Sequence, residues 1–128
     1  MRDLEFRVWD KRYNQYVKPY AICLDGRAIV VNEPCNDLET LDSERVIIEQ
    51  YTGLKDKNGR EIYIGDIVSE RHGDIIGKIV QNPSGEYRIA WIGVFGGEPV
   101  LYDHHTLCEV IGNIHETPGL LVEVKDVN

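Results

Sequence analysis

Residues 50–68, QYTGLKDKNGREIYIGDIV, decide how the rest of the chain is interpreted. Asp56 to Gly59 have the composition of a type I turn, which favours a side-chain oxygen at its first position and glycine at its last. Asn58 and Gly59 also tolerate a positive φ angle. Apolar residues flank this turn on both sides. The sequence therefore predicts a hairpin that fixes the register of two strands, with Asp66 at the beginning of the next strand.

Length and cysteine content limit the class of protein. The 128 residues fit one domain, or two small subdomains that share a core. The three cysteines, Cys23, Cys35 and Cys108, form no C-x-x-C pair, so we expect reduced thiols rather than a disulfide framework. No segment has the length and apolarity of a membrane span, and early charges such as Arg2 and Asp3 argue against a secretory leader. A cytoplasmic protein without membrane contact is expected.

Charge argues against nucleic acid as the usual partner. The chain carries 14 basic and 22 acidic side chains, a net charge of −8. The acidic excess lies in the middle and the C-terminal third, whereas residues 1–31 hold a small basic excess. Because an acidic domain repels phosphate backbones, the charge balance disfavours nucleic-acid binding unless that basic excess gathers on one face.

Short apolar runs separated by turn residues indicate a β-rich chain, and no stretch shows the 3.6-residue period of an amphipathic helix. Asp25 and Gly26 separate two such runs, 20–24 and 27–31, as the loop of a type I′ hairpin would. Residues 32–43, with Pro34 and an acidic cluster, are interpreted as a connection that holds a subdomain boundary. Later predicted strands include residues 46–48, 87–91, 100–102, 108–114 and 120–124.

Three groups of residues, taken together, resemble the YopX protein family. They are Phe6–Asp10, the central motif Gln50–Gly59 with Ile62, Tyr63, Gly65, Asp66, Ile67 and Val68 behind it, and Val110–Glu116 with Pro118, Leu120 and Leu121. This resemblance spans almost the whole chain and implies an origin in bacteriophages and prophages of Gram-positive bacteria. It implies a mostly β protein whose C-terminal part is like an SH3-type barrel, and it brings no activity, ligand or catalytic residue.

The fold prediction follows from the strand pattern and this resemblance. We predict a mainly β protein in which a small N-terminal β-hairpin subdomain, residues 1–45, packs on a C-terminal SH3-like β-barrel, residues 46–128. The two subdomains are expected to form a single compact unit.

One cluster carries reactive groups: Asp103, His104, His105 and Cys108. His105 and Cys108 have the spacing of zinc ligands, although a closed structural site needs four. Cys108 with a histidine base would be a nucleophile, as in a small metal- or thiol-dependent enzyme. In a third, structural interpretation, the adjacent histidines point to opposite faces of a strand and Cys108 is a core residue. We favour this structural interpretation, and therefore expect no catalytic residue, metal or cofactor.

Aromatic residues near the N-terminus are the candidate binding residues: Trp9, Tyr13 and Tyr16. With Lys11, Arg12 and Lys18 they could form a stacking platform for single-stranded nucleic acid over the segment Trp9–Tyr20. Cross-strand packing is the simpler explanation, and tyrosines are also enriched at protein interfaces. The sequence thus predicts a non-enzymatic domain that binds a phage or host protein, or its own copies.

Overall fold

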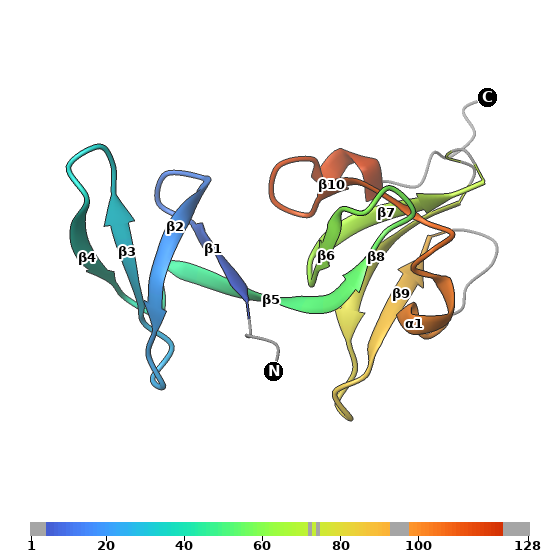
Figure 1. Ribbon diagram of the computed structural model, residues 1–128, viewed down its shortest axis with the longest axis horizontal. Coiled ribbons are helices and arrows are strands. Elements are labelled where there is room, and N and C mark those ends of the chain that lie inside the picture. Colours follow the sequence, from blue (N-terminus) through green and yellow to red (C-terminus); the bar gives the residue numbers. More distant parts are fainter. Residues whose placement is uncertain (1–4, 72, 74, 93–97, 122–128) are drawn as a thin grey trace. The chain divides into compact units, whose positions relative to one another are not determined.

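The computed structural model describes residues 5–71, 73, 75–92 and 98–121. The chain divides into two compact units, residues 1–51 and 52–128. This division falls inside one long strand, β5 (Val46–Lys55), whereas the boundary expected from the sequence lies just before that strand. Strand β5 pairs with strands of both units and so belongs to each in turn (Figure 1). Within the described residues, no helix has the length and apolarity that crossing a membrane requires.

The N-terminal unit is an antiparallel sheet with the order β4-β3-β2-β1-β5. Its other strands are β1 (Phe6–Asp10), β2 (Gln15–Ile22), β3 (Ala28–Asn32) and β4 (Asp37–Leu41). Apolar side chains that alternate along these strands form its core, namely Val8, Ala28, Val30, Leu41 and Val46. Because β1 pairs antiparallel with β5 and Asp10 lies opposite Val46, the loop after β1 and the turn before β5 reach the same end of the sheet.

The sequence prediction for residues 32–43 was wrong, because this segment contains strand β4. Strand β4 pairs with β3 in register, placing Leu41 opposite Ala28 in the core. Its remaining residues are exposed, and an edge strand tolerates acidic side chains that a central strand would not. Pro34 lies in the turn before β4, so it interrupts no ladder.

The turn at Asp25 and Gly26 also differs from the expected type I′ geometry. Gly26 has a φ of +93° and its N–H donates to the carbonyl oxygen of Cys23 at 3.0 Å, whereas Asp25 does not have a positive φ. A type I′ turn needs positive φ at both central residues. The hairpin therefore closes through a type I turn followed by glycine in the left-handed region.

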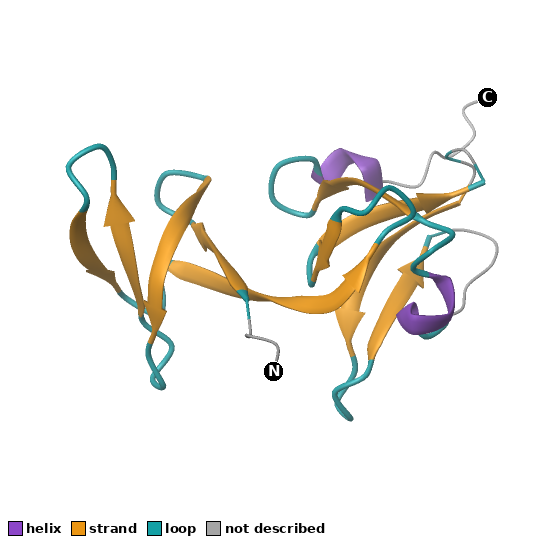
Figure 2. Cartoon of the chain, viewed as in Figure 1, coloured by secondary structure: helices purple, strands orange, loops and turns teal. Residues whose placement is uncertain are grey.

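The C-terminal unit contains an antiparallel sheet with the order β10-β7-β8-β9 (Figure 2). Its elements are β6 (Glu61–Tyr63), β7 (Asp66–Glu70), β8 (Ile75–Gln81), β9 (Tyr87–Trp91), the short helix α1 (Leu101–His104), β10 (Glu109–Asn113) and the 3-10 turn η1 (Pro118–Leu121). The core is formed by Ile62, Val68, Ile79, Ile89, Leu101, Cys108 and Val110.

Two strands predicted in this unit were wrong. Helix α1 occupies most of the run 100–102, and η1 covers the beginning of the run 120–124, whose end lies outside the described residues. An apolar run of three residues fits one turn of helix as well as a strand, so periodicity cannot separate the two.

The predicted fold class is confirmed in its coarser form: the chain is mainly β, with antiparallel sheets. The described strands form open sheets and do not close into a barrel. An SH3-like arrangement of the C-terminal unit therefore stays a prediction.

The central turn joins β5 to β6 and is held by the side chain of Asp56. The Gly59 N–H donates to the Asp56 carbonyl oxygen at 3.0 Å, and Gly59 has a φ of +83°. Asp56 Oδ1 accepts the N–H groups of Asn58 and Arg60 at 2.9 and 2.8 Å. The central turn is therefore closed by a backbone hydrogen bond and by hydrogen bonds to the Asp56 side chain. The buried carboxylate of Asp66 similarly accepts the N–H of Tyr63 at 2.8 Å, between β6 and β7.

Candidate functional site

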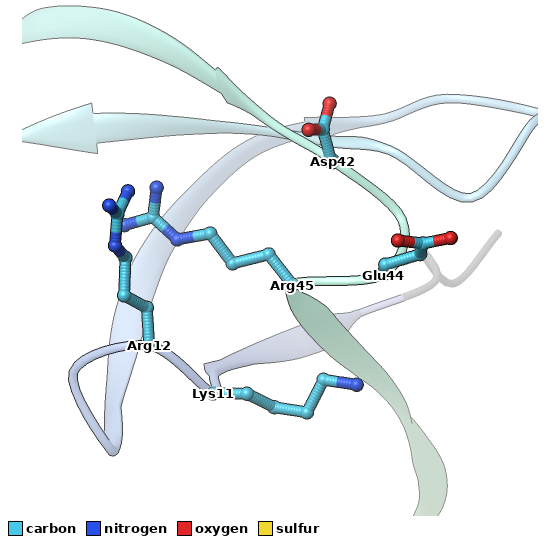
Figure 3. A pocket seen from close by; sticks show the side chains of 5 residues that line it. All are labelled: Lys11, Arg12, Asp42, Glu44 and Arg45. Carbon is cyan, nitrogen blue, oxygen red and sulfur yellow. The ribbon is translucent and has the colours of Figure 1, made fainter.

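A shallow pocket of about 400 Å³ lies in the N-terminal unit, at the end of the sheet where β1 leads into β2 (Figure 3). It is lined by Lys11, Arg12, Asp42, Glu44 and Arg45. The N–H of Lys11 donates to the carbonyl oxygen of Arg45 at 2.9 Å, which fixes the β1–β2 loop beside the start of β5. In Figure 3 the guanidinium groups of Arg12 and Arg45 lie on one side of the pocket and Glu44 on the other.

Arg45 is held in place by a buried carboxylate. Its Nε and Nη2 donate to Oδ1 and Oδ2 of Asp10, each at 2.9 Å, and Asp10 is 1 % exposed. The Arg12 N–H donates to the same Oδ1 at 2.9 Å. The hydrogen bonds from Arg45 are the main reason that the pKa of Asp10 lies below its usual value of 3.8. A paired geometry of this kind fixes the guanidinium before any ligand arrives.

Tyr13 stands beside two guanidinium groups. Its side chain is 63 % exposed, and the Cζ atoms of Arg45 and Arg12 lie 5.4 and 5.9 Å from the centre of its ring. Both distances are within the range of a cation–π contact. Lys11 and Arg12 have no carboxylate partner within ion-pair distance in the part of the chain that the structure describes. We call Lys11, Arg12, Tyr13 and Arg45 the Tyr13 cluster.

The structure does not bring the three predicted binding residues together. Trp9 is 5 % exposed and packs edge-to-face on Tyr16, with ring centres 4.9 Å apart. The Tyr16 O–H donates to Glu49 Oε1 at 2.9 Å, and Glu49 also pairs with Arg7 at 2.7 Å. Trp9 and Tyr16 thus take part in packing on the sheet, and Tyr13 is the member of the set whose ring is mainly open to solvent.

Sequence reasoning missed Arg45, which lies in the turn just before β5, far from Tyr13 in the sequence. One signal could have found it: Arg45 is the single basic residue among six acidic ones in residues 32–51. A lone cation in an acidic segment is a candidate for a structural ion pair, but the pairing with Asp10 depends on the β1–β5 register, which places Asp10 opposite Val46.

The two histidines of the predicted reactive cluster in the C-terminal unit bond to different partners. His104 Nδ1 lies 2.8 Å from Glu70 Oε2, and His105 Nδ1 donates to the Lys55 carbonyl oxygen at 2.7 Å. Asp103 is exposed on α1. Among the described residues, no three His, Cys, Asp or Glu side chains gather as metal ligands.

Cys108 is buried in the core of this unit. Its Sγ donates to the His105 carbonyl oxygen at 3.6 Å, so it contacts the backbone of that residue instead of the imidazole ring. Burial, together with the charges of Glu70 and Asp56, raises the pKa of the thiol to about 12. At neutral pH the sulfur is therefore protonated, which is unfavourable for a nucleophile or a metal ligand.

Comparison with models of known protein families identifies the family of this chain. The model of the YopX protein family matches residues 5–122. The chain belongs to the YopX family. The resemblance that the sequence motifs carry is thereby confirmed. No functionally curated protein matches this YopX-family chain.

A solved structure similar to this YopX-family chain is the crystal structure of protein EF1440 from Enterococcus faecalis. The two share 24 % sequence identity with a TM-score of 0.61, and the match covers 95 % of this chain and 100 % of that one. At this identity the likeness shows the fold alone.

The two predicted sites of this YopX-family chain differ in how their side chains are engaged. The C-terminal histidines and Cys108 are occupied by structural contacts, whereas the Tyr13 cluster exposes an aromatic ring and two cations without acidic partners among the described residues. When a partner covers exposed Tyr and Arg side chains, these residues often contribute more to the binding free energy than other interface residues.

Proposed function

We propose that this YopX-family chain is a phage- or prophage-encoded, non-enzymatic domain that binds a protein partner in the host cytoplasm through the Tyr13 cluster. The observation that supports the proposal most is the position of Tyr13, exposed to solvent beside the guanidinium groups of Arg12 and Arg45. Tyr and Arg are the residues most enriched among binding hot spots. Because Asp10 already fixes Arg45, little side-chain freedom is lost there on binding.

The charges of the cluster indicate the chemistry of the partner. Lys11 and Arg12 have no carboxylate partner among the described residues, so a partner with acidic side chains fits them. A second copy of this acidic chain is one such partner, and a host or phage protein is another. Self-assembly and binding to a different protein thus use the same contacts.

Single-stranded nucleic acid is a weaker candidate for the same surface. Stacking on Tyr13 and contacts to Lys11 and Arg12 would suit a nucleic-acid strand. Asp42 and Glu44 line the same pocket, however, and the chain carries a net charge of −8. Both features repel the continuous row of phosphates of a nucleic-acid strand, whereas a protein partner can place acidic groups at Lys11 and Arg12 and basic groups at Asp42 and Glu44, so a protein partner is favoured.

For the C-terminal unit we propose an SH3-like arrangement that is not closed into a barrel. The antiparallel order β10-β7-β8-β9 and the separate β5–β6 pairing support this proposal. Such a fold hosts many functions and therefore carries no activity by itself.

The test compares the wild type with two single variants, Tyr13→Ala and Tyr20→Ala. Tyr20 is as exposed as Tyr13 and belongs to the same unit, but it lies outside the cluster, so it is the matched control. The measurements are native mass by light scattering and retention of host-lysate proteins on each immobilised variant. We expect an oligomer or a retained protein whose yield falls about tenfold in Tyr13→Ala and is unchanged in Tyr20→Ala.

Two results would contradict the proposal. One is a monomer that retains no protein, and the other is retention that Tyr13→Ala leaves unchanged. A mobility shift of single-stranded DNA at low salt that depends on Tyr13 would instead favour the nucleic-acid alternative.

A further inference from the structure

Two loops of the N-terminal unit carry opposite charges and meet at the pocket that Figure 3 shows. The loop between β1 and β2 contributes Lys11 and Arg12, and the turn between β4 and β5 contributes Asp42 and Glu44. The hydrogen bond from the Lys11 N–H to the Arg45 carbonyl oxygen holds the two segments side by side. The pocket therefore has a basic loop and an acidic turn on its rim.

These four exposed charges have no partner of opposite sign within the described part of the chain. None of Lys11, Arg12, Asp42 and Glu44 joins an ion pair there, although all of them line one pocket. The neighbouring charges are engaged, because Arg45 pairs with Asp10 at 2.9 Å and lies 3.8 Å from Glu39. Two unpaired positive and two unpaired negative side chains thus remain on the rim.

A partner of a single charge sign would be opposed by half of these side chains. An acidic surface is repelled by Asp42 and Glu44, and a basic surface is repelled by Lys11 and Arg12. The complementary surface therefore carries both signs, with an acidic group opposite the loop and a basic group opposite the turn.

The pocket of a second copy is a surface with this pattern. In Figure 3 the Arg12 guanidinium and the Glu44 carboxylate lie on opposite sides of the pocket. A half-turn about an axis that crosses the pocket mouth between these two groups places Arg12 of one copy against Glu44 of the other, and the reverse contact follows by symmetry. The charge pattern is therefore self-complementary.

Tyr13 supplies apolar area beside these charges. Its ring is 63 % exposed and lies next to the guanidinium groups of Arg12 and Arg45, which line the pocket. Ion pairs that stay in water contribute little to binding, whereas pairs from which a covered aromatic ring excludes water contribute more. An interface that covers Tyr13 therefore strengthens the charge contacts around it.

The net charge of −8 on each chain opposes self-association only at long range. At about 0.15 M salt, charges separated by more than about 8 Å are largely screened. The direct contacts between the two pockets therefore decide whether two copies associate.

We propose that two copies of this chain associate through this pocket in a two-fold arrangement, in which Arg12 of each copy pairs with Glu44 of the other. This inference rests on the proposed function, because it uses the Tyr13 cluster, and it names the partner as a second copy. A two-fold interface repeats every contact, so the pairing of Arg12 with Glu44 occurs twice. Reversing one charge in every chain therefore changes two contacts at once.

Charge reversal tests the proposal, because it makes opposite predictions for single variants and for their mixture. Wild type, Arg12→Glu and Glu44→Arg are studied by sedimentation equilibrium up to millimolar concentration, at about 0.15 M salt. We expect a dimer of the wild type, and a dissociation constant at least about tenfold higher for each variant alone, because like charges then meet at both contacts. An equal mixture of the two variants should regain the wild-type constant, since both contacts again join opposite charges. The double variant Arg12→Glu/Glu44→Arg should regain it for the same reason.

Asp37→Arg is the matched control for Glu44→Arg. Asp37 is exposed in the same unit but lies outside the pocket, and its reversal changes the net charge by the same amount. This variant should dimerise like the wild type, and circular dichroism checks that every variant is folded.

Three results would overturn the proposal: a wild type that stays monomeric at millimolar concentration, single reversals that leave the dimer unchanged, and a mixture that fails to regain it. The outcome for the proposed function is separate. If the wild type is monomeric but retains a host protein through Tyr13, the two-fold interface is refuted while the proposed function stands.

Discussion

Asp56 is the side chain on which the central turn of this chain depends. Its carboxylate is only 6 % exposed. Oδ1 accepts the N–H groups of Asn58 and Arg60, and Oδ2 accepts the Val110 N–H at 2.9 Å. The first two bonds shape the turn, and the third ties it to β10, far along the chain. One residue therefore holds a local and a long-range contact together.

Replacing Asp56 by alanine removes all three acceptors at once. The Val110 N–H is buried, so leaving it without an acceptor costs about 1–3 kcal/mol. Asn58 and Arg60 are exposed residues whose N–H groups can turn to water, so each of these bonds contributes about 0.5–1.5 kcal/mol. We expect Asp56→Ala to lower the free energy of unfolding by about 2–6 kcal/mol. Asp56→Asn, which keeps one acceptor oxygen, should lose less.

The assay is urea unfolding followed by circular dichroism, with the free energy extrapolated to water. Asp103→Ala is the matched control, because Asp103 is an exposed aspartate of the same unit. Its unfolding free energy should stay within about 0.5 kcal/mol of the wild type. A loss below about 1 kcal/mol in Asp56→Ala, or one equal to that of the control, would refute this account of the turn.

Three further predictions concern other residues. Gly59 has a φ of +83° and an added Cβ would meet no atom within 4 Å, so only backbone strain opposes substitution. Gly59→Val should cost about 1–3 kcal/mol in urea unfolding and Gly59→Asn less; equal losses would argue against strain. Iodoacetamide at mildly alkaline pH should modify the exposed Cys35 and leave the buried Cys108 unmodified, as measured by mass spectrometry. Rapid labelling of Cys108 in the folded chain would contradict the raised pKa of its thiol. Because the Arg45 hydrogen bonds lower the pKa of Asp10 below 3.8, they stabilise the fold above that pH, and this stability is lost as pH falls through the lowered pKa. Asp10→Asn should lower the thermal unfolding temperature at neutral pH and reduce the further loss in acid; two identical acid profiles would count against the pairing.

Much of the fold is visible in the sequence because its turns carry strong local signals. Asp56 at the beginning and Gly59 at the end of the central turn are residues that this turn type favours, and the apolar alternation on either side is typical of strands. These signals are local, so one sequence is enough to detect them. The family motif likewise lies in this stretch, and the bonds of Asp56 explain it as structural.

Features that depend on distant pairing were harder to predict. Strand β4 is acidic and exposed, and it is a strand because β3 lies beside it. Arg45 joins the Tyr13 cluster only through the β1–β5 register, which no local pattern reveals. Trp9 looked like a possible binding residue, yet its burial depends on contacts such as the ring of Tyr16. In each case tertiary context decides whether the side chain is exposed.

The central claim is that the chain binds a protein through the Tyr13 cluster. The most direct measurement is the affinity of wild type, Tyr13→Ala and Tyr20→Ala for the protein captured from host lysate, or for the chain itself if light scattering shows an oligomer. The account predicts that Tyr13→Ala weakens this affinity about tenfold while Tyr20→Ala matches the wild type. Equal affinities for all three chains would contradict it.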